Sequence, residues 1–426
     1  MADLPKLLEK GGTVEIGHLK LSCLMWADDI VLLCETEDGL RKSLDIVGKY
    51  CNENKLTVNT DKTQCMIFNK TGRLIRRKFL LNGRQLELVR SYKYLGFIFT
   101  PSGEITTGLK DLKDRALKGF WKLKNSMGNE FIRNISTTIT LFDSLIKPII
   151  LYAADFWGCL NAPKSNPVDT LHHMVCRQLL RVGKYTANIG VLLELGRVPL
   201  HISAVKLSVK NWERIRKGLA NEVLLASYAE STTLPWLSGI KSKLETNGML
   251  SFYQDLHADK PTFIYKKIHE RLTDNFHQEA FSIIKSQGSK LRTYGLIKTE
   301  IGFEKYLDEM DNTKTRTEFT KFRISAHRLR IETGRYIKRD KNKKDPCTEK
   351  LCPFCIDKTE CEIHFLLHCP KYELIRALPM RQIRKRIPGF RFYTDIEKFQ
   401  VLLSKECPET PKVIEKCMEF RREMLD

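Results

Sequence analysis

The chain has 426 residues, of which 42% are hydrophobic and 29% are charged, so it is long enough for two or three domains with sizeable cores. The length excludes a short disulfide-held peptide, and the hydrophobic and charged fractions exclude a wholly disordered chain. Lysine and arginine number 72 against 51 acidic residues, and the net charge of +21 predicts an anionic partner, either nucleic acid or an anionic membrane surface.

The distribution of apolar residues favours nucleic acid over a membrane. No apolar run approaches the ~18 residues of a spanning helix, and the most apolar stretch, residues 149–160, is broken by Asp155. The N-terminus, MADLPKLLEKGG, lacks the features of a secretory signal peptide, so we expect a cytoplasmic or nuclear protein. In a reducing compartment its 13 cysteines are expected to be core thiols and metal ligands rather than disulfides.

The first predicted feature is a β-hairpin with acidic residues at its bend. Alternating apolar residues predict a strand over residues 18–25 and a second over residues 30–34, with Asp28 and Asp29 between them. Carboxylate oxygens suit Mg²⁺, and a tight turn fixes their direction. Because successive side chains on a strand point to opposite faces, Asp28 is the favoured direct ligand. The alternative is an acidic turn that faces water.

The pattern then continues as a small α+β layer. Leu40, Leu44, Val47 and Cys51 recur at helical spacing after two acids suited to a helix N-terminus. Further strand-like runs cover residues 64–68, 78–81 and 92–100. From residue 104 the pattern is helical to about residue 345, so the sequence predicts a small antiparallel sheet with a helix, followed by an all-helical region.

A cysteine and histidine cluster lies near the C-terminus. The segment C-P-F-C-I-D-K-T-E-C-E-I-H-F-L-L-H-C-P contains Cys352-x2-Cys355-x8-His364-x4-Cys369. A Cys-x-x-Cys turn presents two thiolates to one ion, and a histidine and a cysteine one helical turn apart can complete a tetrahedral Zn²⁺ site. Three further candidates could replace a ligand, namely Cys347, Cys361 and His368. The alternative is a reduced-thiol cluster in a small core around Phe354, Phe365 and Leu366.

Before this cluster lies a strongly basic segment, residues 314–344. Its arginines and lysines can neutralise phosphates, and Phe322 and Tyr336 lie among them as candidate stacking platforms. A charge run is more often simply a solvated face, and the run 338–344 resembles a linker. The predicted nucleic-acid contacts are Arg323, Arg328, Arg330, Arg335, Lys338 and Arg339.

The order of these blocks resembles the reverse transcriptases of non-LTR retrotransposons (LINE-type elements). The motifs that carry the resemblance are W-A-D-D, N-T-D-K-T-x-x-M-I-F and S-Y-K-Y-L-G. The resemblance implies that Asp28, with Asp29 beside it, helps to hold the Mg²⁺ ions of a polymerase palm. It also places Lys62 near the nucleotide phosphates, where a surface lysine on a turn is the alternative. The implied primer grip is Tyr92, Tyr94, Leu95 and Gly96, which a packed strand would explain equally well.

The resemblance extends beyond the first hundred residues. Residues 146–158 and 193–200 look like the thumb and post-thumb helices of these elements, and the cysteine and histidine cluster resembles their zinc knuckle. The predicted fold is α+β, and its predicted division is a partial palm at 1–100, a helical thumb region at 101–235, a basic helical linker at 236–345, a zinc knuckle at 346–372 and a helical tail at 373–426. RNA and DNA are the implied partners.

Two departures from the family weaken the polymerase interpretation. Only 27 residues precede Asp28, too few for the fingers and for the upstream strand with the other metal-binding aspartate, so we expect no polymerisation by this chain alone. Trp26 stands where the family usually has phenylalanine or tyrosine. No motif indicates a nuclease. The sequence therefore supports the C-terminal portion of a LINE-type RNA-directed DNA polymerase, with a non-catalytic nucleic-acid-binding derivative or an inactive relic as alternatives.

Overall fold

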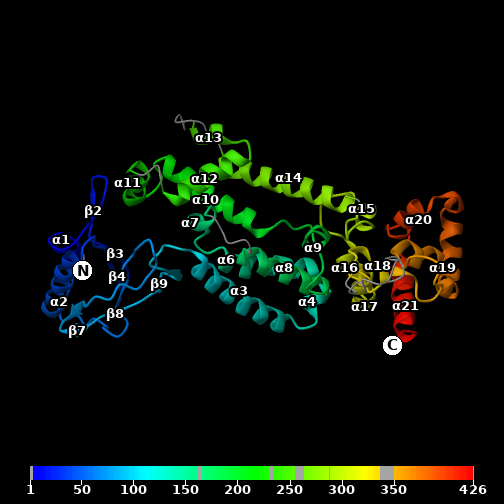
Figure 1. The fold of residues 1–426 in the computed structure, drawn as a ribbon, viewed down its shortest axis with the longest axis horizontal. Coiled ribbons are helices and arrows are strands. Elements are labelled where there is room, and N and C mark those ends of the chain that lie inside the picture. The colour runs from blue at the N-terminus through cyan, green and yellow to red at the C-terminus, as the bar shows by residue number, and fades with distance from the viewer. Residues whose placement is uncertain are drawn as a thin grey trace, which may run out of the picture. The chain divides into compact units, whose positions relative to one another are not determined.

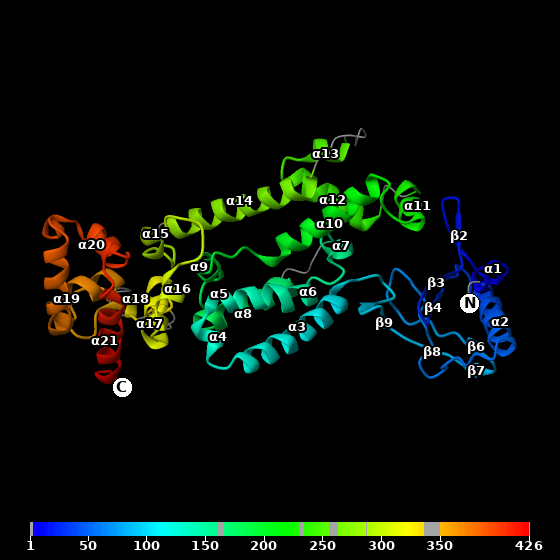
Figure 2. The same cartoon turned by 180° about the vertical axis from the view of Figure 1, so that it is seen from behind.

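The computed structural model describes residues 3–160, 166–230, 234–254, 263–286, 288–335 and 350–425, and Figures 1 and 2 show the fold from opposite sides. Helices dominate it, and the named strands all lie in the first hundred residues. The chain forms two compact units: unit 1 is Met1–Ala116, Ile149–Val168 and His201–Arg271, and unit 2 is Leu117–Pro148, Asp169–Leu200 and Leu272–Asp426. The predicted α+β class with a mostly helical remainder is confirmed.

The strands of unit 1 form five separate two-stranded pairs, so the predicted small antiparallel sheet is divided into pairs. Four pairs are antiparallel: β1 (Val14–Ile16) with β2 (Leu19–Leu21), β3 (Cys23–Trp26) with β4 (Asp29–Leu32), β6 (Leu80–Leu81) with β7 (Arg84–Gln85), and β9 (Tyr92–Tyr94) with β10 (Phe97–Phe99). The fifth, β5 (Gln64–Cys65) with β8 (Glu87–Leu88), is parallel.

Two predicted strands are each divided in the structure. The run over residues 18–25 breaks at the buried Ser22, so that β2 and β3 belong to different pairs. The run over residues 92–100 folds back on itself, because Leu95 and Gly96 have φ values of +44° and +83°. Positive φ at both central residues is typical of the tight turns that join hairpin strands. A period-two pattern alone does not reveal such a turn.

A small core holds the strands of unit 1 against two helices, α1 (Leu4–Leu8) and α2 (Glu37–Glu53). The predicted helix is thus confirmed as α2, and the Thr36 side chain caps it by accepting a hydrogen bond from the Gly39 amide. The Tyr50 hydroxyl donates to Asp3 Oδ1 at 2.7 Å, which ties α2 to the residue that precedes α1. The core buries Leu4, Leu8, Leu44, Val47, Phe79 and Leu81, among others.

The middle of the chain is helical, as predicted. Its helices are α3 (Thr106–Met127), α4 (Glu130–Arg133), α5 (Ile135–Leu141), α6 (Lys147–Ile150), α7 (Ala154–Trp157), α8 (Pro167–Leu180), α9 (Asn188–Glu194), α10 (Leu200–Arg216), α11 (Glu222–Glu230), α12 (Pro235–Thr246), α13 (Leu250–Gln254), α14 (Ile264–Lys285), α15 (Tyr294–Ile297) and α16 (Tyr306–Glu309). A π-helical turn, Phe142–Ile146, separates α5 from α6. No described helix has both the length and the apolarity needed to cross a membrane.

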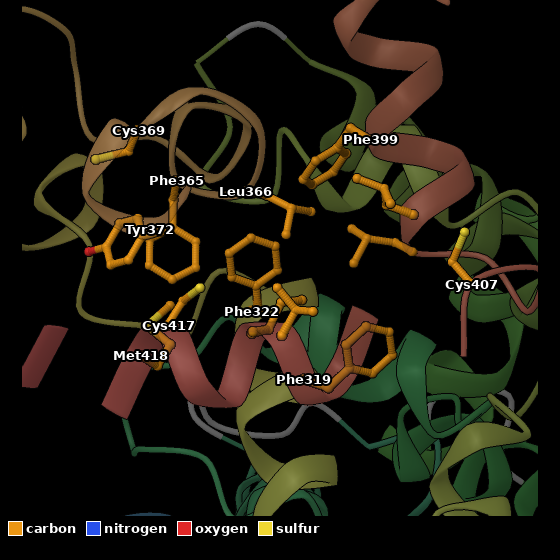
Figure 3. Packing of buried hydrophobic residues seen from close by; sticks show 14 of the residues in the cluster. Phe319, Phe322, Phe365, Leu366, Cys369, Tyr372, Phe399, Cys407, Cys417 and Met418 are labelled. Atoms are coloured by element: carbon orange, nitrogen blue, oxygen red, sulfur yellow. The ribbon is translucent and has the colours of Figure 1, made fainter. Parts of the chain in front are cut away.

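The last hundred residues belong to unit 2 and share one hydrophobic core (Figure 3). Its helices are α17 (Thr313–Arg323), α18 (Arg330–Thr333), α19 (Glu373–Arg386), α20 (Asp395–Leu402) and α21 (Thr410–Glu423). Phe322, Phe365 and Tyr372 meet in this core, with Phe399 from α20 and Met418 from α21. The core therefore takes side chains from both sides of residues 345 and 372, where we predicted domain boundaries.

Candidate metal centre and acidic hairpin

The structure brings together the four side chains predicted to bind zinc. One ligand atom from each of Cys352, Cys355, His364 and Cys369 lies within 4.8 Å of the others. Sγ of Cys352 is 3.8 Å from Sγ of Cys369, and Sγ of Cys355 is 3.4 Å from Nε2 of His364. A tetrahedral zinc ion with Zn–S bonds of about 2.3 Å and a Zn–N bond of about 2.0 Å separates two sulfurs by about 3.8 Å and a sulfur from a nitrogen by about 3.5 Å. These two observed distances therefore fit tetrahedral zinc.

A short turn presents the first two cysteines. Leu351 and Thr359 form an antiparallel bridge, and the Cys352 amide donates to the Lys358 carbonyl at 2.8 Å. Within this loop the Ile356 amide donates to the Cys352 carbonyl at 3.0 Å, and Ile356 has a φ of +58°. The chain thus reverses direction around Cys355, and both thiols point to the same side.

A π-helical turn, His364–His368, presents the other two ligands. The Cys369 amide donates to the His364 carbonyl at 2.8 Å, which is the i to i+5 bond of a π-helix. This wider turn explains the four-residue gap, since in an α-helix residues i and i+5 lie on different faces. Arg376 of α19 is buried and donates to the carbonyls of Phe365 at 3.1 Å and Cys369 at 2.6 Å, which fixes the end of the turn.

The electrostatics of three of the four donors also suit a cation. Burial raises the pKa of the Cys352 thiol to about 12, so its thiolate needs a positive charge nearby. Burial also opposes the thiolate of Cys355, but backbone amides of Asp357 and Lys358 and the Cys352 side chain outweigh it and lower the pKa of Cys355. Burial lowers the pKa of His364, which favours the neutral imidazole that a metal requires. Zn²⁺ matches this set of soft sulfur and nitrogen donors.

The structure separates the quartet from two of the three alternative ligands. His368 lies 2.7 Å, through Nε2, from Oδ2 of Asp395. Cys361 accepts a hydrogen bond from the His364 amide at 3.5 Å and is not among the four grouped side chains. Cys347 lies outside the described residues. Among the residues that the structure describes, this quartet is the one group of three or more potential metal ligands that lie close together.

Two fully buried glutamates fasten the knuckle segment, residues 350–372, to the rest of unit 2. Glu360 forms two hydrogen bonds with Arg421 of α21, at 2.7 and 2.8 Å. Glu362 contacts Arg292 at 2.7 Å and His327 at 3.0 Å. The alternative of an apolar core around Phe365 and Leu366 is also realised, because both residues share a larger core with Cys352 and Cys369.

The acidic hairpin is the second candidate site. Trp26 pairs with Asp29 at the end of the β3–β4 ladder, so Ala27 and Asp28 form a two-residue turn. Ala27 has a φ of +54°, and Asp28 lies exposed at the tip, while Asp29 begins β4 and is also exposed. Trp26 is 67% exposed. The described residues bring no group of three or more potential metal ligands to this tip.

The predicted primer-grip residues form a second hairpin that is held from outside. Tyr92 and Tyr94 lie on β9, and Leu95 and Gly96 form the turn to β10. The Tyr152 hydroxyl donates to the Leu95 carbonyl, and Arg115 donates to the Gly96 carbonyl, both at 2.5 Å.

The two hairpins also influence each other. Partial burial raises the pKa of Tyr94, and the charge of Asp29 raises it further. The charge of the acidic hairpin therefore affects the ionisation of Tyr94. Lys62, by contrast, is exposed on a turn, where its amide donates to the Asn59 carbonyl at 3.2 Å. Its predicted role near phosphates stays a prediction.

Two residues predicted to contact nucleic acid are buried instead. Arg323 is 5% exposed, and its Nε donates to Glu194 at 2.7 Å while Nη2 lies 2.9 Å from Glu304. Phe322 is 1% exposed and packs in the core of Figure 3, so it is no stacking platform. Burying an arginine requires a fixed carboxylate partner, and Glu194 supplies it. These two predictions are wrong.

The remaining predicted arginines differ in exposure. Arg328 and Arg335 are exposed and Arg330 is half-buried. Arg335 lies 3.5 Å from Glu332 in an ion pair. Tyr336, Lys338 and Arg339 lie outside the described residues.

Unit 2 also contains a cleft of about 620 Å³ that was not predicted from the sequence. Its walls include Tyr185, Lys290, His327 and Glu332. Tyr185 is 77% exposed, and the ammonium of Lys184 lies 4.9 Å from the centre of its ring. The sequence signal that could have revealed this cleft is the pair Lys184 and Tyr185, a lysine beside an aromatic residue in a loop between two helical patterns.

Comparisons with known proteins agree with this geometry. Residues 1–99 match the family described as reverse transcriptase (RNA-dependent DNA polymerase), and this range holds both hairpins. A Retrovirus-related Pol polyprotein from type-1 retrotransposable element R1 2 of Nasonia vitripennis is 22% identical over 224 residues, which are 49% of this chain and 54% of that protein.

The chain is related to the reverse transcriptases of non-LTR retrotransposons. A second relative is the Putative uncharacterized transposon-derived protein F52C9.6 of Caenorhabditis elegans, which is 27% identical over 174 residues, covering 40% of this chain and 60% of that protein. The chain thus spans between half and two thirds of the length of these two relatives. The activity of these longer relatives is therefore a proposal for this chain.

Proposed function

We propose that this chain is the C-terminal, nucleic-acid-binding portion of a non-LTR retrotransposon reverse transcriptase. The observation that carries the proposal is the coincidence of the family match over residues 1–99 with an exposed aspartate, Asp28, at the tip of a two-residue hairpin turn. The β3–β4 and β9–β10 hairpins would be part of the palm, and the helices from α3 onward would supply the thumb.

Asp28 is the residue that would hold Mg²⁺ in this palm, with Asp29 beside it. When bound, Mg²⁺ activates a primer hydroxyl and stabilises the leaving pyrophosphate. Two metal ions need more carboxylates than one turn supplies, and the described residues bring no third ligand to Asp28. These 426 residues alone are therefore expected to bind nucleic acid without extending a primer.

Unit 2 would add a nucleic-acid-binding surface around Tyr185. An exposed aromatic ring flanked by cations is the combination that binds unpaired bases and their phosphates. Lys184 lies over the Tyr185 ring, Lys290 donates to the Tyr185 carbonyl at 3.4 Å, and the exposed Arg328 follows His327 of the cleft wall in the sequence. Most of these contacts would be to phosphates and rings, so binding should depend on salt and little on sequence.

The metal centre would serve this surface structurally. Cys352 and Cys369 are buried in the core, and the knuckle is fastened by two ion-paired glutamates rather than projecting into solvent. A closed site with four protein ligands is the usual form of structural zinc.

Two measurements test the proposal. Fluorescence anisotropy with a labelled RNA–DNA hybrid that carries a single-stranded RNA overhang should show binding that weakens steeply as salt rises, and the double change K184Q and Y185A should weaken it. Binding that is absent, or unaffected by salt, would refute the nucleic-acid function. K305Q combined with I301A, a matched change at an exposed lysine and an exposed apolar residue elsewhere in unit 2, should leave affinity unchanged.

The second measurement is primer extension on an RNA template with Mg²⁺. The 426-residue chain should incorporate no nucleotides, and Asp28→Asn should not alter its affinity for the hybrid. Incorporation by the wild-type chain that Asp28→Asn abolishes would show that the metal site is complete after all. That outcome would replace the binding role with a catalytic one.

A further inference from the structure

The end of α19 and the turn after it form a basic exposed surface in the C-terminal region. Residues 381–394 contain five lysines or arginines and no acidic residue. Four of the five are exposed and form no ion pair with the described residues, namely Arg381, Arg384, Lys385 and Arg391. The fifth, Arg386, is held by two hydrogen bonds to Glu409, at 2.7 and 2.8 Å.

Helical geometry places three of these cations together. Arg381, Arg384 and Lys385 are spaced i, i+3 and i+4, so they lie on one face of α19. The opposite face packs inward through Arg376 and Ile383, both of which are buried. The cationic face is therefore directed to solvent by the packing of the helix.

The turn that follows α19 in the sequence presents an exposed aromatic ring. Gly389, with a φ of +86°, begins a 3-10 turn, Phe390–Phe392, that also contacts α19. Phe390 is 3% exposed and anchors the turn in the core, whereas Phe392 is 91% exposed. The Phe392 amide donates to the Gly389 carbonyl at 2.8 Å. The exposed ring thus projects from a turn whose other aromatic residue is buried.

We propose that Phe392, with Arg381, Arg384, Lys385 and Arg391, forms a binding site for single-stranded nucleic acid, RNA or DNA. Guanidinium and ammonium groups suit phosphates, and an exposed ring offers a stacking surface to an unpaired base. A base in a duplex is already stacked, so the ring distinguishes single strands from duplexes. This inference rests on the proposed nucleic-acid function and adds a second surface to it, separate from the Tyr185 cleft.

The same helix also carries apolar side chains that allow another partner. Leu374 and Leu378 are 93% and 65% exposed and continue the stripe of Arg381 and Lys385 towards the start of α19. A protein partner would contact these leucines, whereas a nucleic acid that binds through its phosphates and one base would not. The absence of acidic residues and the exposed Phe392 favour nucleic acid.

The experiment measures the affinity of the full chain for three labelled probes: a 20-nucleotide uridine RNA, the matching thymidine DNA and a DNA duplex. The charge variant combines R381Q, R384Q, K385Q and R391Q. Its control combines K305Q, K405Q, K416Q and R422Q, which remove equal charge at exposed positions elsewhere in unit 2. The ring variants are Phe392→Ala and Phe392→Tyr.

The charge variant should bind both single strands more weakly, with a salt dependence shallower by about 0.7 in log–log slope for each lost phosphate contact. The control should keep the wild-type affinity and slope. Phe392→Ala should weaken single-strand binding about 5-fold or more and leave duplex binding unchanged, whereas Phe392→Tyr should retain binding.

Three results would overturn the inference. Charge and control variants that lose equal affinity would mean that total charge, and not this site, is responsible. The charge and ring variants could keep full affinity for nucleic acid while the double change Leu374→Ser and Leu378→Ser abolishes binding of a protein. That result would assign the surface to a protein partner. An equal effect of Phe392→Ala on duplex and single strand would exclude base stacking. If the wild-type chain binds no probe at all, the proposed function itself has failed.

Discussion

Removal of the metal from the Cys352, Cys355, His364 and Cys369 site is expected to destabilise the C-terminal core. Two of the distances between the ligand atoms match tetrahedral zinc to a few tenths of an ångström, and all four ligand atoms lie within 4.8 Å of one another, so binding requires only local adjustment of the side chains. A ligand that binds only the folded state adds about 2.7 kcal/mol of stability at 100 times its dissociation constant and about 4.1 kcal/mol at 1,000 times.

The expected effect on melting follows from these values. For a unit of about 200 residues, 1 kcal/mol corresponds to about 2–4 °C, so saturating zinc should raise the melting temperature of unit 2 by about 5–16 °C. The assay is thermal unfolding of the purified chain after chelation and after addition of one equivalent of Zn²⁺. Metal content by mass spectrometry supplies the stoichiometry, and the absorption of the Co²⁺ form reports thiolate ligation.

Substitutions separate the quartet from its neighbours. Cys369→Ser should abolish the zinc-dependent rise in melting temperature, whereas Cys361→Ser and His368→Ala should retain one zinc per chain, because neither side chain belongs to the quartet. A Cys369→Ser variant that still binds one zinc with wild-type affinity would refute the assignment. Retained stability of the wild-type chain after complete chelation would refute the structural role.

Three further predictions concern the fold around the sites. Gly96→Ala should cost about 1 kcal/mol in urea unfolding, because Gly96 has a φ of +83°, and Gly96→Asn should cost less. Arg323→Met should cost about 3–5 kcal/mol by leaving the buried Glu194 carboxylate unpaired, and adding Glu194→Gln should recover part of the loss. Burial opposes the charge of Glu415, but hydrogen bonds from Lys412 and Thr315 lower its pKa. The stability that Glu415 contributes is therefore present above about pH 4.5 and is lost as the pH falls through the lowered value, so Glu415→Gln should flatten the acid limb of a pH–stability curve.

The features that could be predicted from the sequence are those that neighbouring residues determine. Helix α2 follows from its apolar spacing and its Thr36 cap, and the β3–β4 hairpin follows from alternation on either side of the acidic pair. The zinc quartet follows from ligand spacing within 18 residues, from Cys352 to Cys369. In each case the decisive contacts are close in sequence.

The features that could not be predicted depend on distant partners. Arg323 lies in a basic segment that suggests a phosphate contact. In the structure it is buried and paired with Glu194, which lies 129 residues away in the sequence. The π-helical turn at His364 depends on Arg376 and on the core beneath Phe365. The segment after residue 372 gives no local sign that α21 packs on α17. Period and spacing do not encode these long-range contacts.

A chain of buried polar contacts joins the metal centre to the Tyr185 cleft within unit 2. Glu362 lies two residues before His364 and contacts Arg292 at 2.7 Å, and Arg292 contacts Glu332 at 2.9 Å. Glu332 lines the cleft. Because each of these groups is buried or partly buried and paired, moving one leaves another without its partner.

Loss of zinc should therefore weaken nucleic-acid binding at the cleft even though the metal need not contact the nucleic acid. The variant that isolates this coupling is Glu362→Gln, which leaves the four metal ligands intact but removes the charge that holds Arg292. It should retain one zinc per chain and bind the RNA–DNA hybrid more weakly than the wild-type chain. Thr333→Ser, a matched conservative change in the cleft wall, should leave both properties unchanged. If Glu362→Gln keeps its zinc and its full affinity, the metal centre and the cleft act independently, and any effect of chelation on binding must reflect unfolding of the core.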